Sequence, residues 1–139
     1  MKKLITIFSF LLVAGVGQLQ AQCDTVANYC HENNFTVNYV SDGQNYRALL
    51  FEEQEAEFET TFFEGVTYRI AACTGFQQGN LIFRVKDELG NTLFDSMDHL
   101  NAPYWDFEIE STITVKIVTL LDPLEEPSGC ATILIGFKQ

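Results

Sequence analysis

The sequence predicts an all-β domain: an antiparallel two-sheet sandwich, jelly-roll-like, of about eight strands with a short N-terminal helix. Three observations predict this fold class. Short stretches with apolar side chains at every second position recur along the chain. Turn residues, often glycine or asparagine, separate these stretches. No long amphipathic helix is indicated, so the sheets must be covered mainly by each other.

Residues 1–21 have the composition of a secretory signal peptide. Two lysines precede an apolar run over residues 4–16, and Ala21 offers a small residue for cleavage. The run is shorter than the ~20 residues that cross a bilayer, so we expect no membrane insertion. Gln22 separates Ala21 from Cys23, which is the wrong spacing for a lipid-anchored cysteine. We therefore expect export to the periplasm or the extracellular space.

The expected mature chain, residues 22–139, is long enough for a single domain with its own core. All 19 acidic residues lie in it, whereas two of the eight basic residues leave with the signal peptide, so its formal charge is 6 minus 19, or −13. This charge argues against nucleic acid and anionic membrane surfaces as partners. We expect the acidity to serve solubility, with cation binding as the minor alternative.

Four cysteines in an exported protein predict two disulfides rather than a metal site. Three pairings are open. Cys73 ends one strand-like run and Cys130 begins another, which favours Cys73 with Cys130 and leaves Cys23 to pair with Cys30. The second bridge requires a turn between its two cysteines, because seven residues of unbroken helix span ~10 Å, beyond disulfide reach.

The individual elements follow from local patterns. Residues 24–34 have the apolar spacing of a one- to two-turn helix, for which Asp24 could be the N-cap. Residues 35–40 read as a first strand or an extended lead-in, and residues 41–45 as a turn. The remaining predicted strands cover residues 46–51, 55–63, 66–73, 81–87, 92–95, 104–110, 113–117 and 131–137.

Each strand is expected to have one dry face and one wet face. Tyr68 points toward the core, and Arg69 points away from it. Glutamates alternate with apolar residues over residues 55–59, and a hairpin turn is predicted at Glu64-Gly65. We expect Arg69 to offset these glutamates across that hairpin.

The stretch over residues 58–95 covers 38 of the 139 residues, and the spacing of its predicted core and turn positions can be compared with that of known families. These positions are Phe58, Phe62, Gly65, Tyr68, Ile70, Leu81, Phe83, Val85, Asp87, Gly90, Asn91 and Leu93. The stretch resembles the first half of the bacterial pre-peptidase C-terminal domain, a small jelly-roll sandwich attached to secreted enzymes. The resemblance implies a non-catalytic role in binding, targeting or processing. The second half departs from that pattern at residues 111–113 and at Cys130.

Few side chains are available for catalysis. His31 and His99 are the two imidazoles, and no Gly-x-Ser-x-Gly elbow is present. Cysteines in disulfides have no thiolate with which to attack. The sequence therefore favours a non-enzymatic module for binding or surface interaction, whose unknown partner is a protein or a glycan.

Asp106 and Glu108 keep a second hypothesis open. Residues i and i+2 of a strand lie on one face ~7 Å apart, which suits the two carboxylates of an inverting glycosidase. A small glycan-directed hydrolase of this kind needs a concave pocket that contains both carboxylates and an aromatic wall.

The candidate ligand-binding residues lie in and after the loop over residues 96–103. Tyr104, Asn101, Asp106 and Glu108 combine an aromatic ring with an amide and carboxylates, as sites for a sugar or a peptide do. Alternation directs the neighbouring Trp105 into the core and leaves Tyr104 outside.

Three carboxylates near the same loop are a candidate cation site. Asp95, Asp98 and Asp106, together with His99, offer the hard oxygen ligands that Ca²⁺ prefers. Their spacing matches no calcium loop, so we expect solvated acidic side chains and no cofactor, with Ca²⁺ as the alternative.

Overall fold

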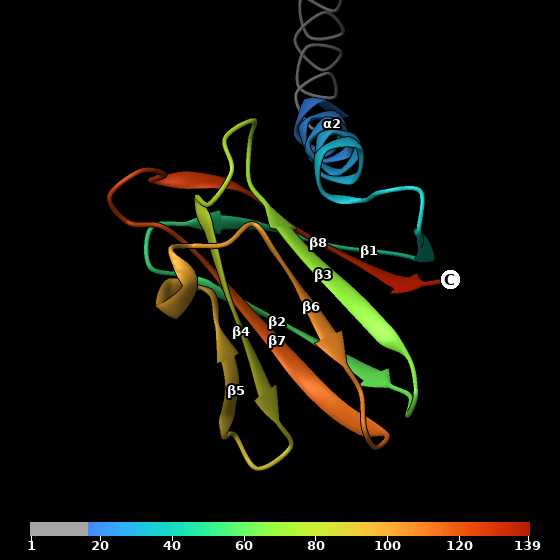
Figure 1. Cartoon of the computed structure of the whole chain (residues 1–139). Helices are drawn as coiled ribbons and strands as arrows, with labels where there is room; N and C mark the ends of the chain where they lie inside the picture. Colours follow the sequence, from blue (N-terminus) through green and yellow to red (C-terminus); the bar gives the residue numbers. More distant parts are fainter. Residues whose placement is uncertain (1–16) are drawn as a thin grey trace, which may run out of the picture.

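The computed structural model describes residues 17–139, which form two antiparallel four-stranded sheets with a helix against one of them (Figure 1). Sheet A has the strand order β1-β8-β3-β6, and sheet B the order β2-β7-β4-β5. The predicted fold class is confirmed. The elements are α2 (Gly17–Asn34), β1 (Tyr39–Phe51), β2 (Glu55–Phe62), β3 (Thr67–Cys73), β4 (Leu81–Asp87), β5 (Thr92–Asp95), η1 (Ser96–His99), β6 (Tyr104–Glu108), β7 (Ile113–Leu121) and β8 (Ser128–Lys138).

The predicted signal peptide lies mostly outside the described residues, and its last five residues, 17–21, begin α2. The helix is longer than the one or two turns predicted. Asp24 lies inside it and pairs with Arg47 of β1 instead of capping its N-terminus. Over residues 17–139, no helix combines the length and apolarity that crossing a bilayer requires.

Two predicted turns have different roles in the structure. Residues 41–45 form a bulge inside the continuous strand β1, where the pairing with β8 shifts register between Ser41 and Asn45. The turn at Glu64-Gly65 joins β2 of sheet B to β3 of sheet A, so it is an inter-sheet connection and not a hairpin. The hairpin prediction failed because a tight turn does not reveal whether the chain stays in its sheet.

The main core lies between the two sheets, as the alternation predicted. Tyr68 and Ile70 of β3 face Phe62 and Phe83 of sheet B, and all four are buried. Trp105 packs at the margin of this core. The other fully buried large side chains include Leu81, Ile117, Leu121, Ile133 and Ile135.

A second, smaller core lies between α2 and the outer face of sheet A. Val26 and Cys30 of the helix pack against Ala71, Cys73 and Leu134 of β3 and β8. The sequence predicted that the outer face of sheet A is exposed to solvent. This part of it is buried, because the helix covers it (Figure 1).

The two disulfides tie this helix to the sheet. Cys23 is bonded to Cys130 and Cys30 to Cys73, so the pairing favoured from the sequence is wrong, although all four cysteines are in disulfides. The helix is unbroken between Cys23 and Cys30, which excludes a bond between them. On adjacent strands, Cys73 lies opposite Thr132 rather than Cys130, and both strand cysteines face the helix.

Arg69 fixes the C-terminal end of the helix. Its side chain lies on the outer face of sheet A and is only 10 % exposed. Nη1 donates to the carbonyl of Asn34, the last residue of α2, at 2.8 Å. Nε and Nη2 donate to the two carboxylate oxygens of Asp106 on β6 at 2.6 and 2.8 Å. The rings of Tyr39 and Tyr104 lie on the guanidinium, each centroid 4.2 Å from Cζ.

This arrangement corrects the predicted role of Arg69. Because β2 and β3 belong to different sheets, Arg69 pairs with Asp106 and not with the glutamates of β2. Within sheet B, Glu57 pairs with Lys116 at 3.0 Å and Glu55 with Arg84 at 3.6 Å. The glutamates are therefore offset by the strands on their own sheet.

The pair shifts both pKa values toward the ionised forms. The hydrogen bonds from Arg69 lower the pKa of Asp106 below its ordinary value of 3.8. The same hydrogen bonds raise the pKa of Arg69. Both groups are therefore charged at any physiological pH.

Removing either disulfide should destabilise the domain strongly. The bonds close loops with sequence separations of 43 and 107 residues. Chain entropy predicts that the double variants Cys30→Ser/Cys73→Ser and Cys23→Ser/Cys130→Ser lose about 4 and about 5 kcal/mol of unfolding free energy. Urea unfolding measures these losses, and non-reducing peptide mapping identifies the bonds; a Cys73–Cys130 peptide would contradict the structure.

Asp106→Asn should lower the unfolding free energy by about 1–3 kcal/mol at neutral pH, less than for a fully buried pair because the carboxylate is partly exposed. The folded-state pKa of Asp106 is lowered, so its contribution is present above the ordinary pKa and is lost as pH falls. The difference between wild type and variant should therefore shrink below pH 3.8 in urea titrations. Glu108→Gln, on the same strand face, is the control and should change stability by less than about 0.5 kcal/mol.

Candidate functional site at the free edge of strand β6

The predicted ligand-binding residues gather on one strand with one exception. Tyr104, Asp106 and Glu108 lie at alternate positions of β6 on the outer side of sheet A, while Trp105 faces inward as predicted. Asn101 lies in the loop before the strand. Among the strands of residues 17–139, β6 lies at the edge of sheet A and pairs with β3 alone.

A cavity of about 470 Å³ lies against this strand, lined by Ala102, Pro103, Tyr104, Trp105 and Asp106. These five residues are consecutive, and their side chains alternate between the two faces of the sheet. A hollow that all of them line must therefore lie along the edge of the strand, where the backbone is accessible. Glu108 and Asn101 do not line it.

The backbone groups at this edge alternate in direction. Pro103 accepts from the N–H of Ala72 at 2.8 Å, and Ile109 donates to the carbonyl of Val66 at 3.1 Å. Antiparallel pairing therefore turns residues 103, 105, 107 and 109 toward β3. The N–H and C=O groups of residues 104, 106 and 108 point away from β3, toward the free edge.

Stacked rings hold the side chains of the cavity in place. The Trp105 ring lies 4.3 Å from the ring of His99, measured between centroids, and 5.0 Å from that of Phe94. His99 in turn stacks on Phe94 with an interplanar angle of 7°. Tyr104 lies on the guanidinium of Arg69 and remains 39 % exposed. The two aromatic rings that line the cavity are thus each packed against a neighbouring side chain.

Asn101 belongs to a different, more polar hollow of about 370 Å³. Its side chain donates to Asp122 at 3.1 Å. Leu100 and Asn101 both have left-handed backbone conformations, with φ of 58° and 53°. Leu100 is also 98 % exposed, an unusual combination of backbone strain and apolar exposure.

The carboxylates of the candidate cation site are not gathered. Asp95 ends β5 in sheet B, whereas Asp106 lies on β6 in sheet A. Within residues 17–139, no three histidine, cysteine or acidic side chains are close enough together to hold a metal ion. Asp95 caps the short helix η1 that contains Asp98, but Asp106 is apart from both in the fold because the chain changes sheets between β5 and β6.

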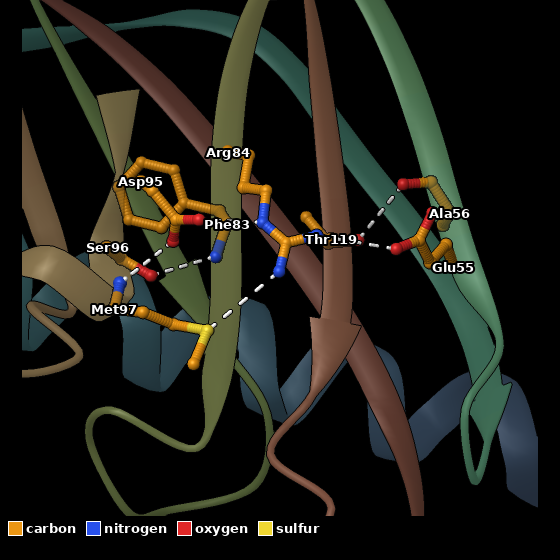
Figure 2. Close-up of polar contacts among 8 residues, drawn as sticks. All are labelled: Glu55, Ala56, Phe83, Arg84, Asp95, Ser96, Met97 and Thr119. Atoms are coloured by element: carbon orange, nitrogen blue, oxygen red, sulfur yellow. Dashed lines mark hydrogen bonds and ion pairs between the residues drawn. The ribbon is translucent and has the colours of Figure 1, made fainter. Parts of the chain in front are cut away.

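Figure 2 shows the polar contacts that Asp95 makes on sheet B. One oxygen accepts from Nε of Arg84 at 2.8 Å, and the other accepts from the N–H of Met97 at 3.0 Å, which caps η1. Arg84 also pairs with Glu55. The hydroxyl of Ser96 accepts from the N–H of Phe83 at 3.0 Å, so a side chain extends the hydrogen bonding of β4 beyond the end of β5.

The proposed catalytic pair is divided between two environments. Asp106 lines the cavity, but both of its oxygens accept from Arg69. Glu108 lies outside it. Among the described residues, the cavity is lined by two aromatic rings and by one carboxylate, that of Asp106.

Sequence reasoning missed the roles of Tyr39, Arg69 and His99. Tyr39 and Arg69 meet Asp106 only because β3 pairs with β6 and because β1 starts beneath the end of the helix. No local pattern indicates either fact. The closeness of His99 to aromatic residues in the sequence was the one available signal for its stacking on Trp105.

No protein-family model matches the chain, and no curated protein matches it. The resemblance of residues 58–95 to the pre-peptidase C-terminal domain thus stays a prediction at the level of the family. What the structure supports is the sandwich fold that this resemblance implied.

Among solved structures, the chain is similar to PliG of Aeromonas hydrophila, described as a periplasmic lysozyme inhibitor of g-type lysozyme. The TM-score is 0.53 with 9 % sequence identity, and the similarity covers 76 % of this chain and 92 % of that chain. At this identity the likeness concerns the fold alone. The chain is therefore a two-sheet β-sandwich of the kind that a periplasmic inhibitor also has.

Proposed function

We propose that the protein is a non-enzymatic, exported module that binds a partner protein through the free edge of β6 and the cavity beside it. The observation that carries this proposal is the cavity itself. Its described lining residues include two packed aromatic rings, and the one carboxylate among them is already paired with Arg69. Such a surface is suited to binding, because no carboxylate among these residues is free to react.

The hydrolase alternative is disfavoured by the state of Asp106. A glycosidase needs one carboxylic acid whose pKa is raised, so that it can protonate the leaving group. Arg69 instead lowers the pKa of Asp106, which keeps it ionised. Glu108 has no share in the cavity and so no enclosed substrate to act on.

Charge and fold together suggest the class of partner. The expected mature chain carries a formal charge of −13, which attracts positively charged proteins and speeds their association. Two disulfides fit an oxidising compartment outside the cytoplasm. PliG, of similar fold, is described as an inhibitor of g-type lysozyme, which makes that enzyme the first partner to test.

Isothermal titration of residues 22–139 with a g-type lysozyme should show binding that weakens as salt is raised, because opposite charges contribute to it. Tyr104→Ala should weaken binding by at least about tenfold, as expected for loss of a central aromatic contact. Tyr39→Ala is the matched control: its ring also lies 4.2 Å from the Arg69 guanidinium but does not line the cavity.

Equal losses in the two tyrosine variants would place the binding surface elsewhere. Release of reducing sugar from a glycan panel, abolished by Glu108→Gln, would contradict the non-enzymatic function. Circular dichroism of both variants excludes unfolding as the cause of any loss.

A further inference from the structure

We propose that β6 receives its partner by strand addition: an extended, basic segment of the bound protein pairs with the free edge and lengthens sheet A. This inference rests on the proposed protein-binding function and specifies its mode. It starts from the backbone groups of residues 104, 106 and 108, which the pairing with β3 leaves directed at the free edge, and Tyr104 and Asp106 also line the cavity. Unpaired edge groups are a template for another strand.

Each of the other three edge strands of the described region carries a protective feature, whereas β6, with five residues and the charged Asp106 and Glu108, is distinguished by the cavity beside it. β1 is interrupted by the bulge between Ser41 and Asn45. β2 carries glutamates on its exposed positions 55, 57 and 59, and β5 has only four residues and a register shift against β4. Bulges, charges and shortness are the means by which proteins block unwanted pairing. β6 is continuous and has a cavity beside it.

The cavity gives an added strand room for its side chains. Those on the inner side would meet the ring of Trp105, and those on the outer side would lie beside Tyr104. Both rings are already fixed, Trp105 by His99 and Tyr104 by Arg69. Binding therefore costs little ordering on this side of the interface, which favours affinity.

Charge indicates that the added segment is basic. Asp106 is satisfied by Arg69, whereas Glu108 has no ion pair among the described residues. A lysine or arginine opposite Glu108 would provide that partner. A second copy of this chain is disfavoured as the occupant, because two antiparallel β6 edges would bring acidic side chains face to face.

The test separates backbone pairing from charge at one position. Glu108→Pro removes an N–H that points to the free edge and leaves the hydrogen bonds to β3 intact, since proline is tolerated there. Glu108→Gln removes the charge and keeps the N–H. The first probe is a capped eight-residue peptide of alternating lysine and valine, added to residues 22–139, and the second is g-type lysozyme. Amide hydrogen exchange followed by NMR reports the edge directly.

Saturating peptide should slow exchange of the amides of Tyr104, Asp106 and Glu108. Glu108→Pro should weaken peptide binding by about tenfold, the effect of a lost hydrogen bond together with the lost charge. Glu108→Gln should weaken it by no more than about fivefold, the effect of an exposed ion pair. Equal losses in the two variants, or peptide binding without amide protection, would overturn strand addition.

The two probes distinguish this inference from the proposed function. If the peptide slows exchange of the edge amides but lysozyme does not bind, strand addition is supported and lysozyme is excluded as the partner. If lysozyme binds but the edge amides exchange as fast as before, the binding function is supported and strand addition is contradicted. Concentration-dependent protection in the absence of either probe would mean that a second copy occupies the edge, which also contradicts the proposal.

Discussion

The contacts of one guanidinium decide how the outer side of sheet A is organised. Arg69 joins the last carbonyl of the helix to a carboxylate on the edge strand, and it does so between two tyrosine rings. A planar cation with donors at fixed angles suits this task, because it can be bidentate, stacked and nearly buried at once. Helix end and edge strand therefore hold fixed positions relative to each other.

Sheet B has a comparable arginine, Arg84, whose side chain is less buried than that of Arg69. Arg84 of β4 pairs with Asp95 on the adjacent strand β5 and, across β7, with Glu55 on β2 (Figure 2). Each sheet thus has a central arginine that binds its edge. The difference lies in what covers them: Arg69 is enclosed by the helix end and two rings, and its partner Asp106 lines the cavity beside β6.

Local patterns predicted what period-two alternation can show. The inward positions of Tyr68, Ile70 and Trp105 and most strand limits follow from it. Strand order does not, because β3 pairs with β8 and β6, far along the chain. The disulfide pairing could not be predicted for the same reason, since it depends on which strands and helices are neighbours. The spacing of Cys23 and Cys30 is incompatible with a bond only if the helix between them is unbroken, and the structure shows that it is. The site was half predicted, since Tyr104 and Asp106 line the cavity and Asn101 and Glu108 do not.

The central position of β8 in sheet A has a consequence for biogenesis. β1 and β3 make no ladder with each other, and the strand that joins them is the last of the described chain. Cys30 and Cys73 both precede Cys130 in the chain, so we expect their bond to be able to form before β8 has been synthesised and to hold the helix beside β3. Sheet A is completed when β8 inserts between β1 and β3. This step should be slow, because it forms contacts between segments far apart in the sequence.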